Sequence, residues 1–262
     1  MNGTDNRRSR WPRSGLRDIA APLSHSPPCG PRDPRLFLLA LALLLLSACA
    51  QTSHHRADGV AEQAALGRGA QVLIVEPDIE LTELLTSGVQ QPRADWTDEA
   101  RRYVTESLES ALTARGARLS HYRVPQDPAL RDEQRQSILL HQAVGTSILL
   151  HRHFNVPLPH KGTAFDWTLG AGVRKLDPDA RYALFVFLRD SYATGNRKAV
   201  MAIGMVFGIG VSLGQQVGFA SLVDLNDGRV VWFNLLNSAT GDMRNPDGAK
   251  AAVAMLMDGV PL

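Results

Sequence analysis

Residues 182–188 read YALFVFL, and this unbroken apolar and aromatic run decides the fold. Successive side chains on a β-strand point to opposite faces of the sheet, so a strand that is apolar at every position is buried on both faces. The run therefore predicts a central strand in a sheet that carries helices. A second run, QVLIV at residues 71–75, is rich in β-branched residues and ends before Pro77, and it predicts another buried strand.

The clearest turn signal in the chain is Asn226-Asp227-Gly228, which separates two further apolar segments. An Asp-Gly pair tolerates the positive φ angles that tight hairpin turns need. We therefore predict a hairpin with strands over residues 215–225 and 230–235. Shorter strands are predicted at 117–124 and 146–150, which gives a sheet of about five or six strands, a common size.

Four segments have the apolar spacing or the end signals of helices, and they cover residues 96–116, 127–144, 165–176 and 246–257. Candidate N-caps are Thr97, Asp127 and Asn245, and Gly116 and Gly145 are candidate stops. Two polar or interrupted segments are interpreted as loops, at residues 78–92 and 190–198. The order of elements predicts an α/β or α+β fold, in which a single mixed sheet has helices packed on it.

The N-terminal region has the layout of an export signal. A basic flank precedes an apolar run at residues 36–46, which is shorter than the about 20 residues of a membrane-spanning helix. The following LSAC at 46–49 resembles the lipobox read by the bacterial lipoprotein signal peptidase. That resemblance implies cleavage before Cys49 and acylation of its thiol and its new amine. By the usual bacterial sorting rule, Ala50 then implies the outer membrane, on its periplasmic side.

This interpretation divides the chain into three parts: a leader and lipoprotein signal peptide at residues 1–48, a flexible tether at 49–70 and a periplasmic α/β domain at 71–262. The formal net charge is only +2, and arginines of the leader supply much of the positive side, so no nucleic-acid partner is expected. The two cysteines are Cys29 in the leader and Cys49 at the lipid site. No disulfide is therefore expected within the mature domain.

Motifs that carry chemistry are absent from the sequence. It contains no Gly-x-Ser-x-Gly elbow, no His-Glu-x-x-His and no phosphate-binding loop. His151 and His153 would face one side if they lay on a strand, with His141 and His160 nearby in sequence, but no carboxylate accompanies them at a short fixed spacing. We expect no metal, no cofactor and no catalytic residue.

The uncharged stretch AVMAIGMVFGIGVSLG at residues 199–214 is the most unusual feature of the mature chain. Gly204 and Gly208, and likewise Gly210 and Gly214, are spaced so that a helix could approach another backbone closely. The stretch is short for a membrane span. A segment buried against the sheet is the favoured interpretation, and a membrane-inserting segment or a subunit interface remains open.

Three stretches carry a family resemblance: VLIVEPDIELTELLTSG at 72–88, PRADWTDEAR at 92–101 and GFASLVDLNDGRVVWFN at 218–234. Together they resemble a group of poorly characterised proteobacterial periplasmic lipoproteins with a compact α/β domain. The last stretch is also distantly similar to the curli-secretion channel lipoproteins and to the lipoprotein activators of penicillin-binding proteins. No catalytic residue follows from these resemblances.

The sequence thus predicts a non-enzymatic lipoprotein that acts as a binding or assembly module of the cell envelope. Its expected partners are the membrane, through lipidated Cys49, and an envelope protein or further copies of the chain. Besides Cys49, the structural or interaction candidates are Trp96, Gly204, Gly208, Gly210, Asp224, Gly228 and Trp232. The alternatives are an oligomeric pore or secretion-channel component that uses residues 199–214 and, less favoured, an envelope hydrolase.

Overall fold

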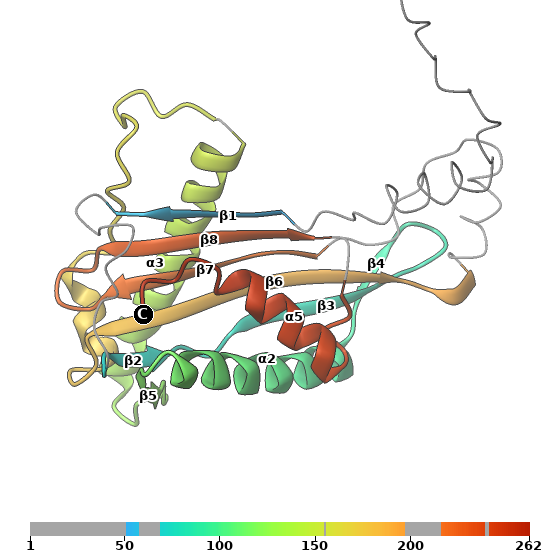
Figure 1. Cartoon of the computed structure of the whole chain (residues 1–262), viewed down its shortest axis with the longest axis horizontal. Helices are drawn as coiled ribbons and strands as arrows, with labels where there is room; N and C mark the ends of the chain where they lie inside the picture. The colour runs from blue at the N-terminus through green and yellow to red at the C-terminus, as the bar shows by residue number, and fades with distance from the viewer. Residues whose placement is uncertain (1–50, 58–68, 155, 197–215, 239–240) are drawn as a thin grey trace, which may run out of the picture. The chain divides into compact units, whose positions relative to one another are not determined.

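The computed structural model describes residues 51–57, 69–154, 156–196, 216–238 and 241–262. All of them lie in one compact unit, Ala48–Leu262. A mixed eight-stranded sheet forms the centre of this unit, and helices pack on it (Figure 1). The predicted α/β fold class is confirmed. The sheet has more strands than the five or six expected.

The strands are β1 (Gln51–Arg56), β2 (Gln71–Ile74), β3 (Asp78–Leu84), β4 (Gln90–Pro92), β5 (Arg118–His121), β6 (Tyr182–Ala193), β7 (Gln216–Asp224) and β8 (Val230–Ser238). Their order in the sheet is β1-β8-β7-β6-β2-β5, with β3 paired to β6 and to β4. Strand β6 is central, as predicted, because it pairs with β7 on one side and with both β2 and β3 on the other. The predicted hairpin is formed by β7 and β8, which pair antiparallel.

Strands β2 and β3 lie end to end along β6, and one additional residue separates their registers. Ile74 is opposite Leu184 and Asp78 is opposite Phe187, so four steps along β2 and β3 match three steps along β6. The side chains change faces across this joint, since even-numbered Ile74 and odd-numbered Ile79 belong to the same buried cluster. The joint therefore behaves like a β-bulge.

The helices are α2 (Ala94–Ala114), α3 (Pro128–Ile148) and α5 (Pro246–Leu256), with a π-helical turn η1 (Leu149–His153) and a 3-10 turn η2 (Ala171–Leu176). Two predicted caps are confirmed: the Asp127 side chain accepts a hydrogen bond from the Ala129 amide, and the Asn245 side chain accepts one from Gly248. Thr97 is not an N-cap. Its hydroxyl accepts a hydrogen bond from the Leu81 amide and so joins α2 to β3.

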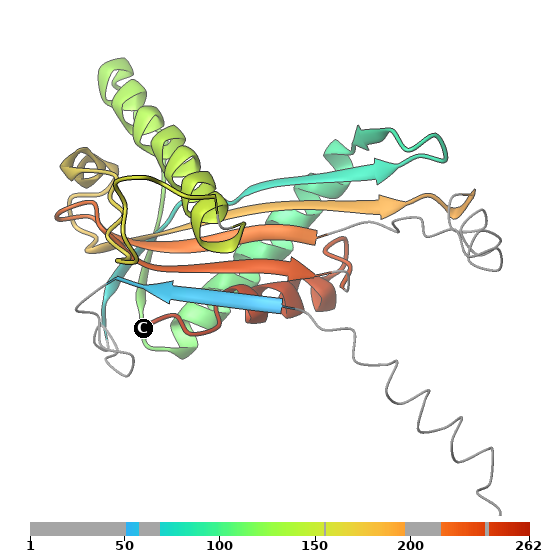
Figure 2. The same cartoon turned by 90° about the horizontal axis from the view of Figure 1, so that it is seen from above.

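Helices lie on both faces of the sheet (Figure 2), and an apolar layer holds them to each face. Helices α2 and α5 cover one face, where Leu108 and Leu256 pack with the even-numbered side chains of β6. Helix α3 and η2 lie on the other face, where Ile148 and Val173 pack with Phe185. None of the helices within the described residues is long and apolar enough to cross a membrane.

Helix α3 corrects one prediction. It continues through Gly145, and the strand expected at 146–150 is the last turn of α3 followed by η1. A Cβ atom on Gly145 would lie 2.5 Å from the ring of Phe219, so this glycine allows close contact between helix and sheet. A glycine needed for close packing looks the same in sequence as a glycine that ends a helix.

Four further segments differ from the sequence interpretation. The loop expected at 78–92 contains β3 and β4, and the loop expected at 190–198 begins with the last four residues of β6. The helix expected at 165–176 is helical only in η2. The tether expected at 49–70 contains β1, which pairs antiparallel with β8 over its whole length. Residues 199–214 lie outside the described part of the chain.

Candidate functional site

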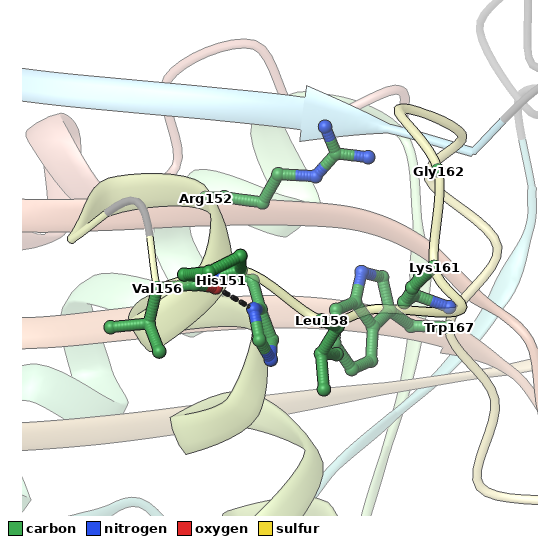
Figure 3. Close-up of a pocket in the computed structure, with 8 residues that line it drawn as sticks. His151, Arg152, Val156, Leu158, Lys161, Gly162 and Trp167 are labelled. Carbon is green, nitrogen blue, oxygen red and sulfur yellow. Dashed lines mark hydrogen bonds between the residues drawn. The ribbon is translucent and has the colours of Figure 1, made fainter.

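A small pocket opens between η1 and the segment that follows it (Figure 3). Its volume is about 170 Å³. The imidazole of His151 stacks on the indole of Trp167 with ring centroids 5.9 Å apart, and the Lys161 ammonium lies 4.2 Å from the centroid of the same indole. Apolar Val156 and Leu158 complete one side of the pocket. The indole faces are thus already occupied by cationic or polar side chains.

Hydrogen bonds fix the shape of this pocket. The Val156 carbonyl bonds to the His151 ring, and the Arg152 guanidinium donates to the carbonyls of Thr163 and Ala164. The Lys161 ammonium donates to the Asp166 carboxylate at 2.6 Å, which lowers the pKa of that carboxyl group. Each cation of the pocket therefore has a partner within the chain. The pocket is a shaped, basic surface without a serine, threonine or cysteine among its lining residues.

A histidine pair joins η1 to the edge strand β1. The rings of His55 and His153 lie 5.4 Å apart, and Phe165 stacks on His55. Burial lowers the pKa of His153 to about 4. Burial, followed by the positive charge of Arg152, lowers the pKa of His55. Both rings are thus uncharged near neutral pH. Within the described residues, no group of three or more candidate ligands could hold a metal ion.

A further histidine lies in the core between α3 and β7. His141 Nε2 is 2.5 Å from Ser221 Oγ, and its ring stacks on Phe185 with centroids 4.0 Å apart. Burial lowers the pKa of His141 to about 3. A serine beside a neutral histidine could in principle act as a nucleophile with its base, but both side chains are buried between α3 and the sheet. The pair fastens α3 to the sheet, and no substrate can reach it in this conformation.

A buried carboxylate occupies the opposite end of the central strand. Asp190 accepts hydrogen bonds from the Tyr192 hydroxyl and from the Gln216 amide, the latter at 2.9 Å. Burial raises the pKa of Asp190 to about 6, although both hydrogen bonds act to lower it. The Tyr192 hydroxyl also accepts a hydrogen bond from the Met243 amide at 2.8 Å, so the cluster connects β6, β7 and the segment before α5. The sequence predicts a loop at Asp190, and no local signal indicates this cluster.

Trp96 belongs to the same end of the molecule. The guanidinium groups of Arg93 and Arg244 lie 4.2 and 4.6 Å from the centroid of its indole ring. The ring of Tyr192 contacts it edge-on at 6.0 Å. This predicted candidate is thus part of an aromatic and cationic cluster that joins α2, β6 and the segment before α5.

The remaining candidates are structural where the structure describes them. Asp224 shapes the hairpin turn, since its carboxylate accepts a hydrogen bond from the Asn226 amide. Gly228 has a φ of 76°, and a Cβ atom there would lie 2.1 Å from the Gly170 carbonyl oxygen. Trp232 is fully buried. The structure does not bring Trp96 together with these hairpin residues. Cys49, Gly204, Gly208 and Gly210 lie outside the described residues.

No family model and no curated protein matches this sequence. Among solved structures, the chain is similar to a PelC dodecamer from Paraburkholderia phytofirmans, with 14% sequence identity and a TM-score of 0.36 over 80% of this chain and 96% of that one. A second crystal form, of a point variant of the same protein, gives 14% identity and a TM-score of 0.37 over 80% and 97% of the two chains. Scores this low assign neither a family nor a function.

Proposed function

We propose that this protein is an outer-membrane lipoprotein, anchored through Cys49 and facing the periplasm, that binds or assembles other envelope components without catalysing a reaction. The observation that carries the binding function is an exposed apolar stripe on α3. Leu139 and Leu140 are exposed, and Ala143 lies one turn beyond Leu139 on the same side of the helix. We call these three residues the α3 stripe.

The stripe lies on the side of α3 that faces away from the sheet. The opposite side buries His141, Gly145 and Ile148. Adjacent exposed leucines on a rigid helix lose little entropy when a partner covers them, and such surfaces favour protein association. The buried Ser221–His141 pair offers a hydrolase nothing that a substrate can reach, which supports a binding role over the hydrolase alternative.

The start of β1 supports close attachment to the membrane. Gln51 is already paired with Asn237 of β8, and it follows the lipid site Cys49 by two positions. Two residues span at most about 7 Å. A lipid on Cys49 would therefore hold the edge of the sheet close to the membrane surface, because β1 occupies part of the segment predicted as a flexible tether at 49–70.

The binding role is tested by photo-crosslinking in intact cells. A photoreactive amino acid replaces Leu139 in the full chain, and the matched control carries it at exposed Glu99 on α2. We expect a specific adduct from position 139 alone. An adduct at twice the mass of the protein identifies further copies of the chain, and another mass identifies an envelope partner. Equal or absent crosslinking at both positions would refute the α3 stripe as a binding surface.

The anchor is tested separately by metabolic labelling. Cys49→Ser removes the thiol that receives the diacylglyceryl group, so we expect no incorporation of labelled palmitate and slower processing of the leader. Gln51→Ser is the control, since it changes a neighbouring residue and keeps the thiol. Continued palmitate incorporation in Cys49→Ser would show that the lipid site is misassigned.

One observation favours the alternative of a pore or secretion-channel component. Residues 199–214 connect β6 to β7, and these strands are paired where Asp190 lies opposite Gln216. Gln216 is also opposite Ser238, next to the position where Gln51 begins β1. The start of β7, which follows the uncharged stretch in sequence, therefore lies at the same end of the sheet as the start of β1. Replacing Val206 and Val211 by aspartate should abolish membrane permeabilisation by this protein if the alternative holds, and continued permeabilisation by this variant would refute the alternative.

A further inference from the structure

We propose that the apolar loop formed by Phe154, Val156 and Leu158 inserts into the headgroup region of an anionic lipid bilayer. This contact would lie beside the lipid anchor and would fix the orientation of the domain on the membrane. The choice of a bilayer as the occupant rests on the proposed lipid anchor, whereas the experiment below measures the exposure of the loop directly.

The exposure of these side chains is the first observation. Phe154 is 65% exposed, Val156 45% and Leu158 40%. Among the described residues, eight large hydrophobic side chains are exposed, and six of them lie between residues 139 and 158. Surface hydrophobics elsewhere are isolated and need no explanation, whereas neighbouring ones on one loop indicate a contact surface.

The loop is held open by hydrogen bonds. The Val156 amide donates to the Leu150 carbonyl at 3.0 Å, and the Lys161 amide donates to the Leu158 carbonyl at 3.1 Å. Pro157 and Pro159 further restrict the backbone. These contacts therefore restrain the backbone on either side of the apolar side chains, in a conformation that leaves Phe154, Val156 and Leu158 exposed. A rigid loop of this kind loses little conformational entropy on insertion.

The charges around the loop match an anionic surface. Between residues 149 and 165 the sequence contains two cationic side chains, Arg152 and Lys161, and no acidic residue. The first acid beyond this range, Asp166, is paired with Lys161. Apolar side chains flanked by cations are typical of segments that lie in the interface of a bilayer containing anionic lipids.

The position of the loop relative to β1 selects a bilayer as the occupant. The ring of His153, next to Phe154, lies 5.4 Å from the ring of His55 on β1. Cys49 precedes His55 by six positions, which span at most about 20 Å. Strand β1 is the edge of the sheet. A lipid on Cys49 would therefore bring the membrane to the same edge of the domain from which the apolar loop projects (Figure 1).

A single-cysteine experiment tests this proposal. Val156→Cys places a reporter thiol in the loop, and Val124→Cys, at a valine that is 61% exposed, is the matched control. Both are made in the full chain with Cys29→Ser, so that Cys49 is the only other cysteine. The proteins are purified as cells produce them and incorporated into phosphatidylethanolamine–phosphatidylglycerol vesicles. If cells produce them without lipid, they are mixed with preformed vesicles of the same composition.

The reaction rate with a charged, membrane-impermeant maleimide is measured in vesicles and normalised to the rate in urea. We expect the thiol at 156 to react about tenfold more slowly than the thiol at 124, since burial of even one large apolar side chain is worth at least about tenfold in an equilibrium constant. Adding Phe154→Ser and Leu158→Ser to Val156→Cys should restore the fast rate.

Two results would overturn the proposal. Equal reaction rates at positions 156 and 124 would show that the loop stays in water. Protection of 156 that disappears when the protein is diluted in excess lipid would show that the loop contacts another copy of the chain. Flotation of the same samples with the vesicles reports the lipid anchor independently. A protein that floats while its thiol at 156 reacts quickly would contradict the insertion of the loop and leave the lipid anchor standing.

Discussion

Asp190 offers the sharpest test of the described core. Its carboxylate is buried at the end of β6 and accepts hydrogen bonds from Tyr192 and Gln216. Replacing it by asparagine keeps an oxygen that can accept both bonds and removes the charge. Because burial raises the pKa of Asp190 to about 6, the charged form destabilises the folded state relative to the neutral form.

The magnitude follows from linkage. The pKa of Asp190 is about 3.8 in the unfolded chain and about 6 in the folded protein. The stability contributed by the neutral carboxyl group is fully present below about pH 3.8 and is lost as the pH rises through about 6. The full shift corresponds to about 3 kcal/mol at about 1.4 kcal/mol per pKa unit. Of this, about 1.4 kcal/mol is lost between about pH 5 and about pH 8.

The assay is urea unfolding of wild type, Asp190→Asn and the control Asp132→Asn at these two pH values. Asp132 is an exposed residue of α3. We expect the stability of Asp190→Asn relative to wild type to increase by about 1.4 kcal/mol from the lower to the higher pH. The control should show no such trend. A difference between Asp190→Asn and wild type that is the same at both pH values would refute a buried carboxylate with a raised pKa.

Three further predictions concern the core. Burial lowers the pKa of His141 from 6.5 to about 3, so the folded protein loses stability as the pH falls below 6.5, the pKa of His141 in the unfolded chain. In urea titrations, wild type should therefore lose about 2 kcal/mol more stability than His141→Phe between about pH 7 and about pH 5. Gly228→Ala should cost about 3 kcal/mol or more in thermal unfolding, whereas Gly172→Ala, which has open space at its Cβ, should have little effect. Trp232→Ala should cost about 3–5 kcal/mol in equilibrium unfolding and leave lipid labelling unchanged; a loss under 1 kcal/mol would contradict its place in the core.

The central part of the fold could be predicted because its signals are local. Strand β6 is apolar on both faces, and the Asp227-Gly228 turn joins β7 to β8. The caps at Asp127 and Asn245 mark the starts of α3 and α5 by ordinary capping chemistry. Each of these signals is complete within about ten residues and does not depend on what the element packs against.

The errors arise where distant contacts decide the structure. The first four residues of β3 alternate acidic and apolar side chains, with exposed Glu80 between buried Ile79 and Leu81, but Pro77 interrupts the run before the strand. Strand β1 is polar because it is an edge strand, so its composition resembles that of a tether. The cluster around Asp190 joins residues of β6, of β7 and of the segment before α5. Nothing in the sequence around any one of them indicates that they meet.

The joint between β2 and β3 limits how the chain length can vary. Side chains alternate with a period of two along a strand, and the additional residue at 75–77 sets the phase in which Ile79 and Leu81 meet α2. Losing or gaining one residue here would turn both side chains towards the side of the sheet where α3 packs. Changes of two residues would restore the phase, so length variation at this joint is restricted to even steps.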